Sequence, residues 1–160
     1  MSRYALFLAT LLVSGMVVSG MVVSACGGPY AGATLQQQVR SWAQSTGFAA
    51  TVGTLQADAR RFAMVEALRD PGALRTDCDV LVNDALSANQ NLPSPDERLT
   101  KTLSSAYTSA ADAGHQCLRG AGGDASALGR ASSDLASAQS GYIKAQARID
   151  ALGAGESSGR

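Results

Sequence analysis

Three cysteines and one histidine are the side chains of this 160-residue chain best suited to chemistry. Cys26 ends an apolar N-terminal run, whereas Cys78 and Cys117 lie in the more polar remainder of the chain. A thiol can carry a covalent group, join a second thiol or bind a metal ion. His115 adds the one side chain whose ordinary titration falls near neutral pH. The elements that carry these residues decide which of these reactions is open to them.

The run before Cys26 has the character of an export signal. It holds no charged residue from Tyr4 to Ala25, and Arg3 stands directly before it. A positive flank followed by an apolar stretch is typical of a secretory signal peptide. The stretch of 22 residues is also long enough to span a bilayer as a helix. Three interpretations are therefore open: a cleaved signal peptide, an uncleaved anchor helix or a lipoprotein signal.

The last four residues of this segment favour the third interpretation. Val23-Ser24-Ala25-Cys26 resembles the lipobox of bacterial lipoproteins, an aliphatic residue and two small residues before a cysteine. The resemblance implies that the Cys26 thiol receives a diacylglyceryl group and that cleavage makes Cys26 the new N-terminus. Two acyl chains suffice for stable membrane attachment. We therefore expect a lipid-anchored protein on the extracytoplasmic face of the cell membrane.

The rest of the chain has the periodicity of helices, because apolar residues recur three and four positions apart and no stretch alternates as a strand does. Asp70 before Pro71 and Asp124 are expected to cap helices, and Ser94 with Glu97 is expected to form a capping box. The pattern predicts an all-α fold, an up-and-down bundle of four long helices with alanine-rich seams. The expected divisions are a signal peptide at 1–25, a flexible tether at 26–33, the bundle at 34–153 and a disordered tail at 154–160. A short leading helix at Leu35–Trp42 could dock on the bundle or lie on the membrane.

We expect Cys78 and Cys117 to form a disulfide, because both fall on core-facing positions and an exported protein meets an oxidising compartment. Two free buried thiols are the alternative. In straight helices of ~1.5 Å rise per residue, the two positions would differ in height by roughly 18 Å. The connection at residues 89–94 would therefore have to continue along the axis of the helix before it.

No set of side chains indicates catalysis, so we expect a protein that is not an enzyme and needs no cofactor or metal. A zinc site would require Cys78, Cys117 and Asp112 beside His115, and it would compete with the disulfide. The 13 basic and 13 acidic residues balance, which gives no electrostatic case for nucleic acid as a partner. A mild basic cluster, Arg60, Arg61, Arg69 and Arg75, is typical of a solvated face, and contact with anionic lipid is the alternative.

Residues 35–152 also resemble small secreted or lipid-anchored helical proteins of actinobacteria, through "DPGALRTDC", a "P-x-P-D" loop and "AADAGHQC". The resemblance implies a helical fold and an exported location, and it implies no activity. The leading functional hypothesis is a structural or interaction module that binds a protein partner of the cell envelope. The alternative is a carrier or sensor that holds a small apolar ligand between its helices.

Overall fold

Five α-helices make up the secondary structure of the residues that the computed structural model describes, 32–68 and 70–154. The all-α prediction is confirmed for this part of the chain, which contains no strand. The predicted signal peptide and most of the predicted tether and tail lie outside it, although the last helix includes residue 154. The helices are α1 (Leu35–Ser45), α2 (Phe48–Leu68), α3 (Pro71–Asn89), α4 (Glu97–Ala121) and α5 (Ala125–Ala154).

Side-chain caps set the helix starts. The Asp70 carboxylate accepts hydrogen bonds of 3.0 Å from the backbone N–H groups of Gly72 and Ala73, with Pro71 in the first turn of α3. Asp124 accepts from the N–H of Ala127 at 3.2 Å in the first turn of α5. Both predicted caps are confirmed, and each satisfies amide groups that a helix leaves without internal partners.

The predicted capping box at Ser94 is wrong. The cap of α4 is Asp96, whose carboxylate accepts from the Leu99 N–H at 2.7 Å. A carboxylate is the stronger acceptor at the positive end of a helix, so Asp96 takes the position that the serine was expected to fill. Ser94 instead stabilises the turn before α4. Its hydroxyl donates to the Asp96 carbonyl at 2.8 Å and contacts the Thr100 hydroxyl at 2.9 Å.

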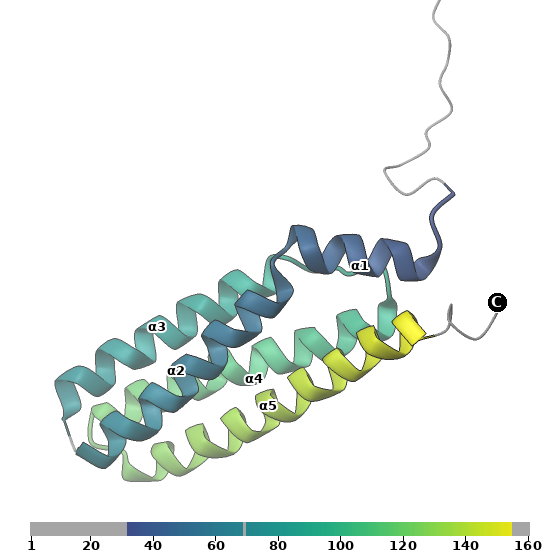
Figure 1. Ribbon diagram of the computed structural model, residues 1–160. Helices are drawn as coiled ribbons and strands as arrows, with labels where there is room; N and C mark the ends of the chain where they lie inside the picture. The colour runs from purple at the N-terminus through teal and green to yellow at the C-terminus, as the bar shows by residue number, and fades with distance from the viewer. Residues whose placement is uncertain (1–31, 69, 155–160) are drawn as a thin grey trace, which may run out of the picture. The chain divides into compact units, whose positions relative to one another are not determined.

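The four long helices pack side by side, and Figure 1 shows each one returning along its predecessor. The closest packing joins α4 to α5 and α3 to α4, whereas α2 packs mainly on α3 and makes few contacts with α5. Alanine fills many of the seams, as predicted, which lets the helix backbones approach closely. The buried alanines are Ala85, Ala88, Ala106, Ala110, Ala111, Ala113, Ala127, Ala131, Ala138 and Ala145.

The leading helix α1 docks on this helical domain. Val39 and Trp42 are buried in the same apolar cluster as residues of α2 to α5. The Trp42 indole N–H donates to the Asn91 carbonyl at 3.0 Å, and the Gln36 side chain donates to the Gly153 carbonyl at 3.0 Å. The sequence left open whether this helix docks on the bundle or lies on the membrane. These contacts favour docking, because the apolar face of α1 packs into the protein core.

The connection between α3 and α4 brings the two cysteines level. Figure 1 shows that this connection runs past α1 before α4 begins. The extra length offsets the difference in height between the two cysteines that straight helices would leave. Cys78 and Cys117 lie with their Cα atoms 5.7 Å apart, within the usual range for a disulfide, and their sulfur atoms are joined. Cys78 and Cys117 thus lie at disulfide distance, as the predicted pairing requires. Phe62, Leu74 and Ala131 bury the bridge in an apolar cluster.

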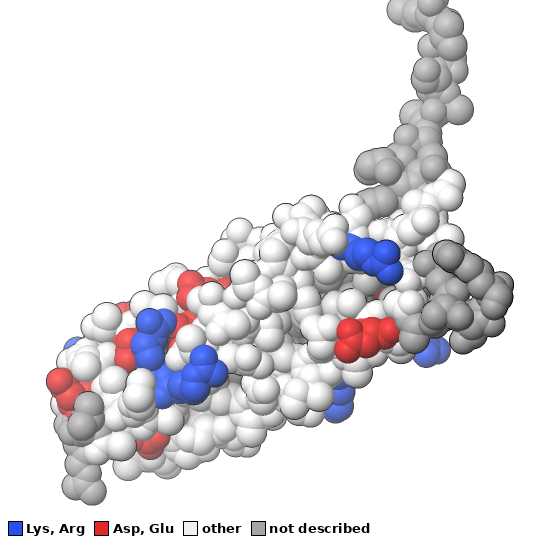
Figure 2. All heavy atoms as spheres, in the orientation of Figure 1, with Lys and Arg blue, Asp and Glu red and all other residues white. Residues whose placement is uncertain are grey.

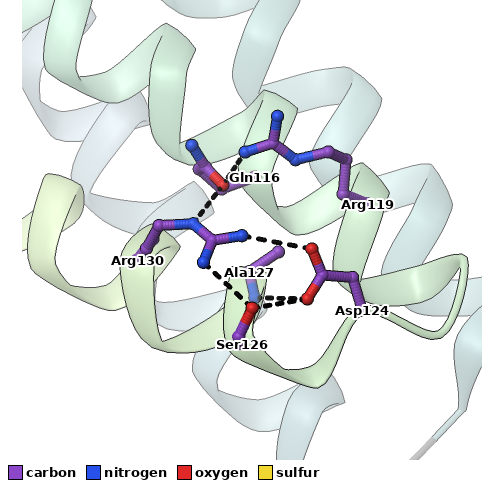
Figure 3. A network of polar contacts seen from close by, with 6 residues as sticks. All are labelled: Gln116, Arg119, Asp124, Ser126, Ala127 and Arg130. Atoms are coloured by element: carbon purple, nitrogen blue, oxygen red, sulfur yellow. Dashed lines mark hydrogen bonds and ion pairs between the residues drawn. The ribbon is translucent and has the colours of Figure 1, made fainter.

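A polar network closes the turn between α4 and α5 (Figure 3). The Arg130 guanidinium donates to Asp124 at 3.1 Å, to Ser126 at 2.9 Å and to Gln116 at 3.0 Å. The Ser126 hydroxyl, together with the Ala127 N–H and Arg130, lowers the pKa of the Asp124 carboxyl. The cap of α5 is thereby tied to the end of α4.

A second ion pair fixes the other end of α4 to α5. The Arg148 guanidinium donates to both oxygens of Asp96, at 2.6 and 3.3 Å, and the Asp96 side chain is only 6% exposed. The hydrogen bond from Arg148, followed by that from the Leu99 N–H, lowers the pKa of Asp96. A carboxyl with a lowered folded-state pKa adds stability above its unfolded-state pKa and loses it as the pH falls.

Replacing Arg148 with Met is therefore expected to lower the free energy of unfolding at pH 7, because the buried Asp96 carboxylate loses its ion-pair partner. The difference from the unchanged chain should shrink as the pH falls below the unfolded-state aspartate pKa of about 3.9. Thermal melts from pH 7 to pH 2 measure this difference. A loss that is the same at every pH would contradict the role given to the ion pair.

Candidate functional site

A hollow of about 520 Å³ lies between α2 and α5, and we call it the α2–α5 groove. Its floor includes Ala110 of α4, and its rim carries Gln56, Arg60 and Glu66 of α2. The volume lies within the ~300–1,000 Å³ range of small-molecule sites. Most of the lining is apolar, and its larger or more buried members in α2 and α5 are Leu55, Phe62, Leu135, Ala138 and Tyr142.

The groove continues toward α1 through further hollows in the same seam. A hollow of about 310 Å³ shares Gln56 and Tyr142 with the groove, and the next, of about 450 Å³, shares Phe48 with that hollow. Ile143, which lines the 310 Å³ hollow, is 61% exposed. Chain-like molecules fit such an elongated seam better than compact ones do.

The seam is open because α2 and α5 are held by other helices and face each other with small side chains. The disulfide fixes α3 to α4, and α5 packs tightly on α4, where a Cβ atom at Gly141 would lie 3.4 Å from the Ala106 Cα. Ala63 of α2 and Ala136 of α5 then leave the space across the seam unfilled. Small residues thus bring α4 and α5 into close contact, whereas Ala63 and Ala136 leave a gap between α2 and α5.

The face that contains the seam is uncharged over its middle. Figure 2 shows blue and red atoms gathered toward the two ends of this face, with white atoms between them. Arg60 and Glu66 line the α2–α5 groove, and Arg40 lines the hollows near α1. A ligand held along this face therefore meets apolar surface in the middle and charged side chains toward both ends.

Tyr142 is the one tyrosine that lines the α2–α5 groove, and it also lines the neighbouring hollow. It is 4% exposed, and its ring lies 6.0 Å from that of Tyr107 on α4. Its hydroxyl oxygen is buried without a hydrogen-bond partner among the described residues. Burial, with a smaller contribution from Tyr107, raises the pKa of Tyr142 well above its ordinary value, so the hydroxyl keeps its proton.

Two carboxyl groups form a separate cluster between α2 and α3. Asp58 is 2% exposed; one of its oxygens pairs with Arg61, and the other has no hydrogen-bond partner within the described part of the chain. The Asp84 carboxyl lies beside it on α3, and burial together with the Asp58 carboxylate raises the pKa of Asp84. A protonated Asp84 can donate to the free Asp58 oxygen, whereas two ionised carboxylates repel each other.

Replacing Asp84 with Asn is consequently expected to raise the melting temperature at pH 7. A carboxyl with a raised folded-state pKa costs stability as the pH rises from its unfolded-state pKa through its folded-state pKa, so the gain should shrink toward pH 3. Thermal melts across this range test the sign. The exposed Asp79 of the same helix supplies the control, Asp79→Asn. Equal effects of the two variants at every pH would contradict the interaction between Asp58 and Asp84.

The residues singled out in the sequence do not meet at one site. Cys26 lies outside the described residues, and Cys78 with Cys117 is enclosed in the core and is not among the residues that line the groove. His115 is exposed, and no group of three or more metal-binding side chains gathers in the described ranges. Of the predicted basic cluster, Arg61 pairs with Asp58 and Arg60 lines the groove, while Arg69 is not described.

Comparisons with known proteins leave the site to be interpreted from its geometry. No protein-family model matches the chain, and neither a curated protein nor a solved structure matches it. Within residues 32–68 and 70–154, no helix has the length and apolar character needed to cross a membrane.

Proposed function

We propose that this protein is a membrane-anchored bacterial lipoprotein that binds an elongated apolar molecule in the α2–α5 groove, and that it acts by binding rather than by catalysis. The observation that carries the binding role is the open, mostly apolar hollow of about 520 Å³. A tightly closed bundle would have favoured a purely structural or interaction module. The exposed Ile143 farther along the seam supports the same interpretation, because it offers an apolar ligand additional surface.

The lipid anchor on Cys26 and the helical bundle that carries the groove are the other two parts of the proposal. The lipobox places two acyl chains on Cys26, and a tether of seven residues, 27–33, reaches at most roughly 25 Å. The groove would then lie close to the outer face of the membrane, which holds apolar molecules at high local concentration. The order of helix packing supports an up-and-down bundle as the scaffold.

A groove-blocking substitution tests the binding role. Ala136 lines the groove and is exposed, so Ala136→Phe should fill the gap with little cost to the fold. The full chain in nanodiscs is irradiated with a photoreactive palmitic acid, and the labelled peptides are identified by mass spectrometry. Labelling should fall on residues 55–66 and 132–142 and drop at least fivefold, or about 1 kcal/mol, in the variant.

Ala147→Phe is the matched control, because Ala147 is also exposed on α5 but lines none of the hollows in the seam. It should label as the unchanged chain does. Equal labelling of the Ala136→Phe and Ala147→Phe proteins, or labelling confined to other faces, would refute a binding role for the groove.

The anchor is tested separately by intact-mass analysis of the chain made in a bacterial host. The unchanged protein should begin at Cys26 and carry a diacylglyceryl group, and Cys26→Ala should remove both features. An unchanged protein without the added lipid mass would refute the anchor and would leave the result on the groove intact.

A further inference from the structure

Arg40 is the one basic residue of α1, and it lies at the end of the seam where α1 meets α2 and α5. Its side chain is exposed, and it borders the 450 Å³ hollow together with Gln44 and Gln146. Arg40 forms no ion pair within residues 32–68 and 70–154, and Figure 2 shows basic atoms at the α1 end of this face. A guanidinium beside an apolar hollow leaves a positive charge available to a ligand that lies in the seam.

The two ends of the seam differ in charge. Arg60 lines the α2–α5 groove, but Glu66 lines the same hollow and balances its charge. No carboxylate is among the described residues that line the 450 Å³ hollow beside Arg40. Asp150, which lines the next hollow with Arg40, accepts a hydrogen bond of 2.9 Å from the Gln146 side chain. The hollow beside α1 is therefore the part of the seam whose described lining carries a net positive charge.

We propose that the α2–α5 groove and its extension toward α1 hold a long-chain fatty acid, with the carboxylate at Arg40 and the hydrocarbon chain along the seam. The inference rests on the proposed function, because it names the class and the orientation of the ligand in the same site. One guanidinium balances one negative charge and binds a carboxylate through two parallel hydrogen bonds. The amide group of Gln44 offers a further donor at the same end.

The length and lining of the seam fit a single acyl chain. The connected hollows follow α2 from Phe48 to Ala63, which is roughly 22 Å at ~1.5 Å per residue. In a bilayer leaflet an acyl chain covers about half of the ~30 Å hydrocarbon thickness, so it can lie extended within the seam. The middle hollow, which shares Phe48 and Tyr142 with its neighbours, has no charged residue in its described lining. Methylene groups therefore meet no charge between the two ends.

The test uses the full chain in nanodiscs at pH 9, with a photoreactive palmitic acid and its methyl ester, which has the same chain without the charge. Arg40→Gln should raise the half-saturating concentration of the acid about fivefold, or about 1 kcal/mol, as expected for a solvated ion pair. It should leave that of the ester unchanged, and high salt should reduce the effect on the acid. Because Arg40 is exposed and has no ion pair to lose among the described residues, the melting temperature should not change.

Two further substitutions separate contact with the carboxylate from a general effect of charge. Arg75→Gln removes an equal charge from an exposed position of α3 that lines none of the hollows of the seam. Arg60→Gln removes the charge at the other end of the seam. Both variants should bind the acid as the unchanged chain does. An equal effect of Arg40→Gln and Arg75→Gln, or an effect of Arg60→Gln alone, would overturn the assignment of the carboxylate to Arg40.

The orientation is measured independently with two palmitic acids, one with the diazirine next to the carboxyl group and one with it at the far end of the chain. The first should label residues 40–50 and 146–149, and the second should label residues 55–66 and 132–142. The reverse pattern, or the same pattern with both probes, would overturn this orientation while the groove remains a binding site. Failure of both probes to label any residue of the seam would overturn the proposed function as well.

Discussion

Replacing Cys78 and Cys117 together with Ala is expected to lower the free energy of unfolding by about 4 kcal/mol. The bridge closes a segment with a sequence separation of 39, and the chain-entropy model assigns about that stabilisation to a loop of this length. Small domains have only ~5–15 kcal/mol in total, so the loss would be a large share of it. Urea denaturation of both proteins at pH 7 measures the difference.

The bridge itself is checked by alkylation before and after reduction. The folded chain should gain two alkyl groups, at Cys78 and Cys117, only after a reductant is added. The double substitution should make stability independent of reductant. A loss below 1 kcal/mol, or alkylation of both thiols without reductant, would contradict the stabilising role given to the bridge.

Gly114→Ala is expected to destabilise the protein by about 1–3 kcal/mol through overpacking. A Cβ atom at Gly114 would overlap the Val82 side chain and would lie 3.1 Å from the Cys78 carbonyl oxygen and from the Val82 backbone nitrogen. A side chain can rotate away, but the backbone of α3 cannot move without disturbing its packing on α4. The steric cost should therefore exceed the ~1 kcal/mol by which alanine favours a helix over glycine.

Gly129→Ala is the control for this prediction. Gly129 is exposed on α5, and a Cβ atom there would meet nothing within 4 Å. The variant should be stabilised by up to about 1 kcal/mol, so the two substitutions should have opposite signs. A shift of the same sign in both would show that close packing of α3 on α4 does not limit stability.

The helices were predictable because local signals agreed with the tertiary packing. The sequence before Pro71 marked the start of α3, and the apolar spacing placed Leu99, Leu103 and Cys117 on one buried face of α4. The pairing of Cys78 with Cys117 was predicted from their core-facing positions and from the oxidising compartment expected of an exported protein. The cap of α4 was misassigned because Ser94 and Asp96 are both residue types that cap helices, and the carboxylate is the stronger acceptor.

The groove was not predictable from the same pattern. Ala106 and Ala136 are the same residue type at helical spacing, yet the first meets Gly141 at close range and the second borders a gap. Whether a small residue closes a seam or leaves it open depends on how neighbouring helices are held. Tyr142 likewise appeared only as a core position in the apolar series, since nothing local reveals that its hydroxyl has no partner.

The most direct test of the proposed binding role is to identify the compound that the native protein holds in the α2–α5 groove. The full chain is purified from bacterial membranes with Ala136→Phe and Ala147→Phe beside it, and organic extracts are analysed by mass spectrometry. We predict an elongated apolar compound near equimolar amount in the unchanged and Ala147→Phe proteins, in addition to the lipid bound to Cys26, and its loss from Ala136→Phe. Equal amounts in all three proteins, or none in the unchanged protein, would contradict a ligand in the α2–α5 groove.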